Sequence, residues 1–539
     1  MMFKKTLLNA VVLSTLLSVP SVYAANVPTG VHLAKNQSIV IDNKAEPETL
    51  DPQLIEGMPA MHIAVQLFEG LVNLDANGKV TPGVATSWEN KGNKEFIFHL
   101  RHDAKWSNGK SVTAQDFVYA WRRLVTPKLA SPYAYYLQLT GIDNVDAIVN
   151  GKKAPDTLGV KAIDRYTLKV TLAKQVPYFV KMMACTAVFP VYPPAVEKWG
   201  DQWTQPKHMV SNGAYKLSKW VVNSQIVMTR DPDYWNNSKT VISKVTMLPI
   251  ADSVAAMNRY FAGEIDISKF PVEQYKHLKK DDPNQLRITG ALGSYYYSFN
   301  MKKAPFNDIR VRKALSYAID RNIITKDILA QGQLPAYTLT PASVDGFTPP
   351  TPAYATWSQA KRLKVARQLM SEAGYGQQGK HLNVTILYNT NNINKKLALA
   401  IGQMWKQLGV NVHLENQEWK SYLQTLQQQK FDVARTDWYG DYNEPSTFLS
   451  LLTTNNVQNN PKYANPKYDA LINTAMHTAS VKKRAEDYRQ AELLLAKDMP
   501  IAPIYQFVNA RLVRPTVGGY PMHNAMDQYY VKNMYMKAK

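Results

Sequence analysis

The chain has 539 residues, too many for one hydrophobic core, so two or three domains are expected. Apolar residues make up 45% of it and charged residues 19%, which is typical of a globular protein and excludes a disordered chain. The formal net charge is +21, but the Lys and Arg residues are dispersed without a long basic block, which argues against nucleic-acid binding.

The N-terminal segment has the parts of a secretory signal peptide. "MMFKK" is positive, a short apolar stretch follows, and "VYAA" supplies small residues, so residues 1-24 are predicted to be cleaved after Ala24. A membrane anchor is the weaker alternative, because the stretch is short for a bilayer. No later run reaches about 18 uncharged apolar residues, so no direct membrane insertion is expected. The single cysteine, Cys185, allows no internal disulfide, and an exported protein of this kind fits a bacterial periplasm.

Short strands and helices alternate in the first half of the chain. Helical spacing of apolar residues predicts a helix at 62–72, and Asn108-Gly109 predicts a hairpin turn. Thr113 followed by Asp116 resembles a capping box at the start of another helix. The buried stripe of that helix is predicted to be Phe117, Ala120, Trp121 and Leu124. The segments predicted as strands are 38–43, 96–101, 164–173 and 226–235.

The second half has a more regular pattern. An amphipathic helix is predicted at 307–329, with a break near Arg321-Asn322. From 382 onward strand, helix, strand, helix and strand follow one another, which indicates a wound α/β domain. The predicted bounds are strand 382–390, helix 394–409 ended by Gly409, strand 410–417, helix 419–430 and strand 431–438.

The run "TDWYGDYNEPSTF" (436–448) follows the last of these strands and contains Asp437, Asp441 and Glu444 among four aromatic residues. Open α/β sheets bind ligands at the carboxyl ends of their strands. The acids there could be catalytic, could hold a metal, or could bind a positively charged ligand group. An enzyme is disfavoured, because Ser-x-x-Lys occurs three times without the right context and no nucleophile accompanies the acids. The ten His residues are spread out, so no metal site is expected.

Two segments, 67–124 and 305–321, resemble the family 5 extracytoplasmic solute-binding proteins of ABC importers. The runs at 416–449, 211–217, 294–300 and 508–515 are similar to the family's oligopeptide-binding and murein-peptide-binding members. The resemblance implies an α/β protein with the periplasmic binding protein class II (type C) fold, in which three domains form two lobes with a hinged ligand cleft. The implied domains are domain I (25–68, 193–292 and 509–539), domain II (69–192) and domain III (293–508).

The implied function is a periplasmic receptor, not an enzyme, that captures short peptides and delivers them to an inner-membrane ABC permease complex. It would work as a monomer without a cofactor. A murein-tripeptide receptor of the same fold is one alternative, and its ligand would carry an extra acidic group. A chaperone-like binder of unfolded periplasmic segments is another, and a nickel or haem receptor is a third.

The resemblance also implies roles for single residues. Asp441 would pair with the peptide ammonium, because a buried charge without a partner is costly. A local loop role is the alternative for Asp441, and it suits Asp437 and Glu444 better. Two extended segments, Glu56 to Met58 and Asp437 to Tyr439, would hold the peptide backbone by strand addition.

Aromatic and basic residues complete the implied site. Trp419 and Trp438 resemble pocket-lining tryptophans, with core packing as the alternative, and Tyr133 would contribute from the smaller lobe. Arg435 would bind the ligand carboxylate, whereas an ion pair with Asp437 or Asp441 is the alternative. The chain departs from the family at four positions, which are Asn394, Leu426, Gln427 and Ser298. Family members often have an acid at position 298, so its loss predicts a reduced preference for basic ligand side chains.

Overall fold

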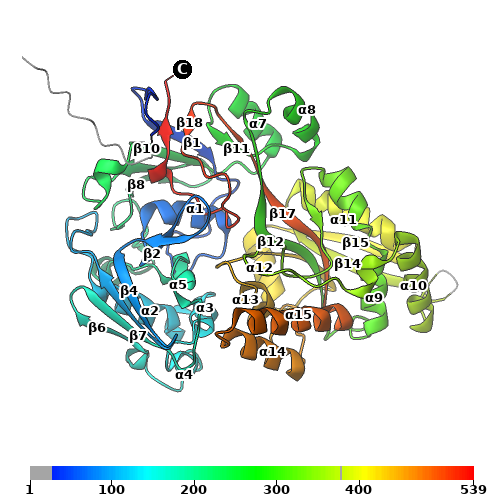
Figure 1. Ribbon diagram of the computed structural model, residues 1–539. Helices are drawn as coiled ribbons and strands as arrows, with labels where there is room; N and C mark the ends of the chain where they lie inside the picture. The colour runs from blue at the N-terminus through cyan, green and yellow to red at the C-terminus, as the bar shows by residue number, and fades with distance from the viewer. Residues whose placement is uncertain (1–26, 377–378, 539) are drawn as a thin grey trace, which may run out of the picture.

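The computed structural model describes residues 27–376 and 379–538, so the predicted signal peptide lies outside the described residues. Most strands belong to one large mixed sheet, in the order β15-β14-β16-β12-β17-β11-β1-β10-β9-β8. Its two longest strands, β12 (Leu286–Phe299) and β17 (Ile501–Val513), are antiparallel neighbours at its centre. They run between two masses of structure, which we call the first and second lobes (Figure 1).

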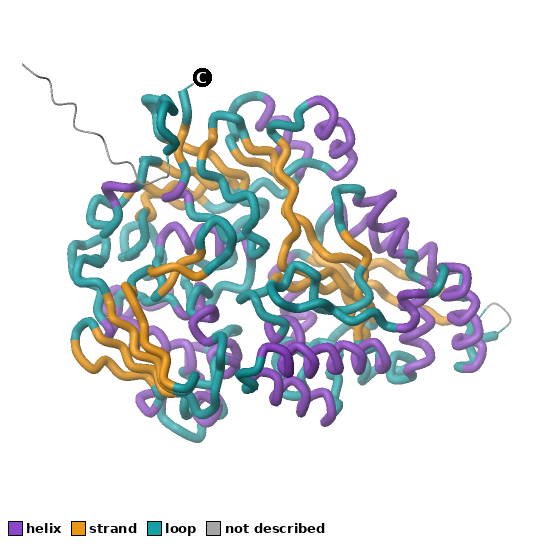
Figure 2. The backbone as a smooth tube through the Cα atoms, in the orientation of Figure 1, coloured by secondary structure: helices purple, strands orange, loops and turns teal. Residues whose placement is uncertain are grey.

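The first lobe contains one end of the large sheet and a separate four-stranded sheet, β4-β5-β7-β6. Figure 2 shows the four-stranded sheet at the lower left, apart from the large sheet. The strands are β1 (Ser38–Asp42), β2 (Val72–Leu74), β3 (Val80–Pro82), β4 (Ala85–Lys91), β5 (Glu95–Leu100), β6 (Val160–Asp164), β7 (Thr167–Thr171), β8 (Tyr215–Val221), β9 (Gln225–Arg230), β10 (Lys244–Leu248), β11 (Ile267–Ser268), β18 (Val517–Gly518) and β19 (Tyr535–Met536). The helices are α1 (Met58–Leu67), α2 (Ala114–Val125), α3 (Ala134–Leu139), α4 (Val145–Val149), α5 (Phe179–Met182), α6 (Pro193–Trp199), α7 (Ser253–Phe261) and α8 (Tyr275–Asp281).

The second lobe contains the other end of the large sheet, where β14, β15 and β16 are parallel and β16 pairs antiparallel to β12. Helices cover this part of the sheet, as the wound α/β prediction requires (Figure 1). The strands are β13 (Leu334–Pro335), β14 (Leu382–Asn389), β15 (Val410–Gln417) and β16 (Val433–Tyr439). The helices are α9 (Ile309–Ala318), α10 (Gln359–Glu372), α11 (Asn392–Lys406), α12 (Trp419–Gln427), α13 (Ser446–Leu449), α14 (Pro466–Met476) and α15 (Val481–Asp498).

Several local predictions are confirmed. The capping box of α2 is present, since Asp116 Oδ2 accepts from the Thr113 backbone N–H at 2.8 Å. The predicted stripe of α2 is fully buried at Phe117, Ala120, Trp121 and Leu124. The break predicted near Arg321 occurs, because α9 ends at Ala318 and a second helical segment begins at Ile323.

Three boundaries differ from the prediction. The helix predicted at 62–72 begins earlier, at Met58, because Pro59 fits its first turn, and the chain becomes extended at Phe68. Asn108-Gly109 forms a tight turn closed by one bridge between Lys105 and Ser111, not a hairpin of two strands. Helix α11 ends at Lys406, and Gly409 follows it with a φ of +77°, a left-handed conformation that suits glycine.

Candidate ligand site between the two lobes

The run 436–448 crosses from strand β16 into a turn and then into α13. Asp437–Tyr439 are the last residues of β16, as predicted, and Asp441–Glu444 form the turn. Gly440 separates the two parts, and its N–H donates to Leu292 O at 2.8 Å. A Cβ at position 440 would lie 2.6 Å from the Leu292 side chain, so this close approach requires glycine. The turn therefore carries its acids from the end of β16 toward the first lobe.

Two of the three acids in this run have an arginine partner. Asp437 forms an ion pair with Arg435, which is two residues away on the same face of β16. Glu444 forms a buried ion pair with Arg484 of α15, with 2.6 Å between Oε1 and Nε. Burial raises the pKa of Glu444, and the charge of Arg484 opposes that shift. Both acids are thus satisfied within the second lobe.

Asp441 is different. Its Oδ1 accepts from the Tyr133 hydroxyl of the first lobe at 3.1 Å, and no Lys, Arg or His of the described chain lies within ion-pair distance. Burial raises the pKa of Asp441 to about 7, although the bond from Tyr133 lowers it. Other buried carboxylates without a cation accept backbone N–H groups, as Glu492 does from Leu339 and Thr340. Asp441 has no such bond among the described residues.

A second acidic group lies near Tyr133. Glu48 Oε1 accepts from the backbone N–H groups of Glu56 and Gly57 at 2.7 and 2.8 Å. Burial, and next the charge of Glu48, raise the pKa of Glu56 to about 7. Burial is the largest cause of the raised pKa of Tyr133. The charge of Asp441 is the next cause, and the charge of Glu56 also contributes. Glu56 and Gly57 lie outside any strand and Met58 begins α1, so of the two predicted extended segments only Asp437–Tyr439 is part of a strand.

Arg435, the third residue of β16, lies in a polar cluster at the carboxyl end of β14. Its Nη1 donates to Asn389 Oδ1 at 3.1 Å, and its guanidinium lies over the ring of Tyr295 at 4.9 Å. Asn394 of α11 joins the cluster by donating to Asn389 Oδ1 at 2.9 Å. The sequence analysis did not select Asn389. Its position as the last residue of β14 was the available signal, since parallel strands end at one edge of a sheet.

The predicted aromatic residues do not form a single wall. Tyr439 stacks on Phe507 of β17 with ring centroids 4.8 Å apart. Trp438 is half-buried, and its Nε1 has no hydrogen-bond partner among the described residues. Trp419 stacks on Tyr422 at 6.1 Å and packs against a small core of the second lobe. The structure therefore brings Trp438 and Tyr439 together on β16 and places Trp419 at the start of α12.

Positions 298 and 426, at which the chain departs from the family pattern, are buried. The Ser298 hydroxyl is hydrogen-bonded to Thr436 Oγ1 at 2.8 Å, between the neighbouring strands β12 and β16. Leu426 packs in the small core beside Tyr422. His, Cys, Asp and Glu residues in 27–376 and 379–538 form no group of three or more that could hold a metal ion.

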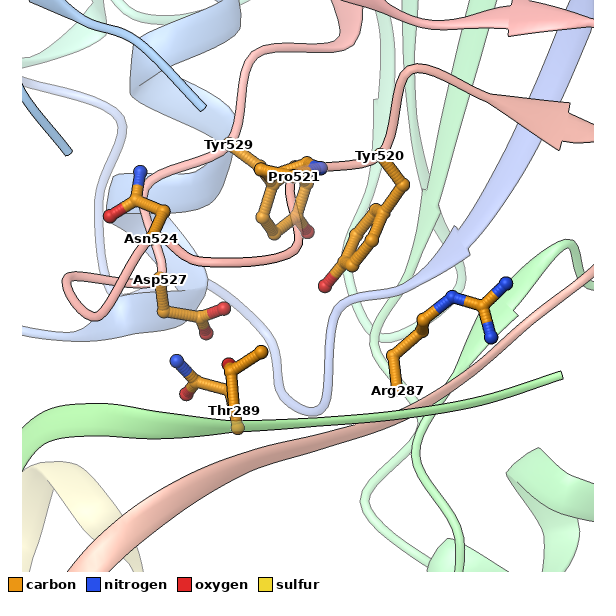
Figure 3. A pocket seen from close by; sticks show the side chains of 8 residues that line it. Arg287, Thr289, Tyr520, Pro521, Asn524, Asp527 and Tyr529 are labelled. Atoms are coloured by element: carbon orange, nitrogen blue, oxygen red, sulfur yellow. The ribbon is translucent and has the colours of Figure 1, made fainter. Parts of the chain in front are cut away.

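A separate small cavity lies beside β12 and β17, away from the Asp441 turn, with space for about one water molecule. Figure 3 shows Arg287, Thr289 and Asp527 around it, under a loop that carries Tyr520 and Tyr529. Its size excludes a peptide.

Two lobes are joined by long central strands, and an acid of one lobe accepts a hydrogen bond from a phenol of the other. These features define a two-lobed ligand-binding protein of the periplasmic type. Residues 79–460 match the model of the middle region of bacterial extracellular solute-binding proteins, family 5, and the chain belongs to this family.

Similar proteins support the same assignment. The periplasmic oligopeptide-binding protein OppA of Salmonella typhimurium is 49% identical, over 99% of this chain and 98% of that protein. The structure of the Escherichia coli murein tripeptide binding protein MppA has a TM-score of 0.92 at 46% identity, covering 94% of this chain and 100% of that one. The structure of Haemophilus influenzae OppA in complex with the peptide RPPGFSPFR has a TM-score of 0.90 at 43% identity, with the same coverage. These relatives are named as binding proteins.

The same comparison shows how the lobes are arranged. A structure of MppA in its unliganded open form has a TM-score of only 0.71, although it is 47% identical and covers 95% of this chain. The chain thus resembles the peptide complex more than the open form, and its lobes are closed on each other. Throughout the described ranges, helices that could cross a membrane are absent.

Proposed function

We propose that this chain is a periplasmic receptor that closes around short peptides and delivers them to an inner-membrane ABC permease complex. The observation that carries the proposal is Asp441, a carboxylate at the lobe interface with no cation partner among the described residues. The ammonium of a peptide supplies the missing charge, and its arrival removes the cost of burying the carboxylate. The receptor performs no chemistry on the peptide and acts as a monomer.

The edge of β16 supports a peptide ligand. On one edge, the whole of β16, from Val433 to Tyr439, pairs with β12. On the other edge, β14 pairs only with Val433 and Ala434. Within the described residues, the backbone of Asp437–Tyr439 therefore lacks a strand partner on that edge. An extended peptide can add there through main-chain hydrogen bonds that do not depend on its side chains.

Unpartnered polar atoms occur on strands β12 and β16 and on α3. Arg435 Nε, Trp438 Nε1, Ser294 Oγ and Tyr135 OH are buried and have no hydrogen-bond partner within the described structure. Ser294 lies directly across from Trp438 in the β12–β16 pair. Buried polar groups are nearly always hydrogen-bonded, so these atoms are available to bind polar groups of a ligand.

Calorimetry with one tripeptide in free and N-acetylated forms tests the proposal. Acetylation removes the ammonium, and we expect the dissociation constant to rise about 30- to 300-fold. Asp441→Asn should weaken binding of the free peptide similarly and should bind the two forms about equally. Asp327→Asn, which changes an exposed acid of the second lobe, is the matched control and should bind as the unmodified protein does. Equal affinity of the unmodified protein for both peptide forms would rule out the proposal.

The alternatives predict other outcomes. A murein-tripeptide receptor would prefer peptides with an additional acidic group over neutral tripeptides of equal length. A chaperone-like binder would hold long reduced chains as tightly as tripeptides. Mass spectrometry of the peptide after incubation checks for new products, which a receptor does not generate.

A further inference from the structure

Asp441 is not the only residue of its turn that contacts the first lobe. The ring of Tyr442 stacks on Tyr178, with centroids 5.7 Å apart and planes within 12° of parallel, and lies edge-on to Tyr136. The Lys181 ammonium donates to Asn443 O at 3.3 Å. Three consecutive residues of the second lobe thus meet the first lobe, and only Asp441 has a role in the proposed peptide site.

The contact continues on both sides of this turn. Ser446 Oγ is hydrogen-bonded to Tyr178 OH at 3.2 Å. At the outer rim, Lys174 Nζ donates to Asn473 Oδ1 at 3.0 Å. His477 Nδ1, just after α14, lies 3.0 Å from Gln175 O. One short segment of the first lobe, 174–181, therefore contacts two elements of the second lobe.

We propose that these residues, which we call the lobe clasp, are positioning residues that set how long the closed receptor retains its peptide. The clasp consists of 174–181 in the first lobe, and of 441–446, Asn473 and His477 in the second. The inference rests on the proposed function, because it concerns retention of the captured ligand.

The place of the clasp explains its effect. Figure 1 shows α13 and α14 beside the region of α3 and α5 in the lower part of the view, whereas β12 and β17 cross between the lobes higher up. Rotation about those strands separates the clasp. Opening then exposes Tyr178 and Tyr442, which are 4% and 0% exposed here, and breaks the polar contacts of the rim.

The clasp contacts and the proposed ammonium partner, Asp441, belong to the same turn. An ammonium that binds Asp441 fixes the turn whose next two residues form clasp contacts, and clasp contacts in turn hold Asp441 in place. The clasp contacts exist only in the closed arrangement, whereas a peptide enters while the lobes are apart. Loss of the clasp should therefore speed dissociation and leave association nearly unchanged.

The test is a double variant, Lys181→Ala with His477→Ala. Both side chains are only half-buried, so the fold should be retained. The matched control is Lys161→Ala with His413→Ala, which removes the same residue types from exposed positions on β6 and β15, one in each lobe. Stopped-flow measurements with one tripeptide should show dissociation about three- to tenfold faster in the clasp variant, with association within about twofold of the control. Lys181→Arg, which keeps the donor, should dissociate as slowly as the unmodified protein.

Small-angle scattering of the empty proteins gives a readout that needs no ligand. The clasp variant should have a larger radius of gyration than the control variant. If the clasp and control variants dissociate at the same rate and scatter alike, the clasp proposal is wrong while the receptor function stands. If the unmodified protein binds no peptide, the proposed function fails, and scattering alone decides whether the clasp holds the lobes together.

Discussion

Two aspartates in this molecule, Asp527 buried and Asp441 half-buried, show opposite electrostatic behaviour. Asp527 lies near the central strands, where both of its oxygens accept from Arg511 of β17 at 2.5 Å and one lies 3.4 Å from His62 Nε2 of α1. Asp441 lies at the lobe interface, and its side chain accepts only from Tyr133 among the residues that the structure describes. Burial by itself would raise the pKa of either carboxyl, but Arg511 and His62 lower that of Asp527, while that of Asp441 rises to about 7.

The difference separates a carboxylate that is neutralised within the protein from one that is not. Asp527 ties the C-terminal loop to β17 and α1, and its charge is neutralised inside the protein. Asp441 is held in place but is not neutralised, so the closed protein without a ligand carries the cost of its burial. Under the proposed function, the ammonium of a peptide removes this cost and so favours closure.

The largest effect is expected from breaking the neutralised pair. Arg511→Met removes both hydrogen bonds that Asp527 accepts from Arg511, and we expect the free energy of unfolding to fall by about 3–5 kcal/mol. Urea denaturation followed by circular dichroism measures this loss. Peptide affinity should change far less than stability in those molecules that remain folded.

The chain offers a matched control for this variant. Arg287 lies directly across from Arg511 in the β12–β17 pair. Within 27–376 and 379–538 it donates only to the carbonyls of Asn284 and Leu286. Arg287→Met should therefore cost about 1 kcal/mol or less. A similar loss for both arginines would show that position on the central strands matters, and that neutralisation of Asp527 does not.

An intermediate effect, of opposite sign, is expected at Asp441. A carboxyl whose pKa is raised on folding favours the folded state below its unfolded pKa, near 4, and this contribution is lost as the pH rises through about 7. Asp441→Asn has no such titration. The variant should therefore gain stability relative to the unmodified protein between pH 4 and pH 8, by about 1–2 kcal/mol.

Urea denaturation of both proteins without peptide, at several pH values, measures that gain. Asp437→Asn is the comparison, because it breaks the ion pair with Arg435 and should lower stability at pH 8. A difference between Asp441→Asn and the unmodified protein that stays constant or falls with rising pH would contradict the assignment of a buried, unneutralised carboxylate.

Much of the second lobe could be predicted from sequence, because its strands and helices alternate with clear periodicity. Strand 410–417 matches β15 at both ends, and the run 436–448 lies at the carboxyl end of β16 as expected. Local rules also apply to Asp437 and Arg435, which are two residues apart and so share a face of one strand. The predicted domain boundaries stay a prediction.

Contacts between distant segments could not be predicted in this way. Asp441 meets Tyr133 across 308 residues, and Glu444 meets Arg484 across 40. Asp527 lies in a loop without periodicity and reaches a histidine 465 residues away. Whether an acid is neutralised depends on such contacts. The sequence can therefore place the acids at a strand end, but it cannot identify which one lacks a cation.

The smallest effect is expected where an ion pair is formed in water. Arg259 and Glu264 are 2.7 Å apart, nearly as close as Arg484 and Glu444 at 2.6 Å, but their side chains are 42% and 54% exposed. Water solvates both charges whether or not they pair, so Glu264→Gln should change the free energy of unfolding by less than about 0.5 kcal/mol. The urea midpoint measures this change. A loss of about 1 kcal/mol or more would mean that pairing distance, and not burial, decides what a carboxylate contributes, and the contrast between Asp527 and Asp441 would then need another cause.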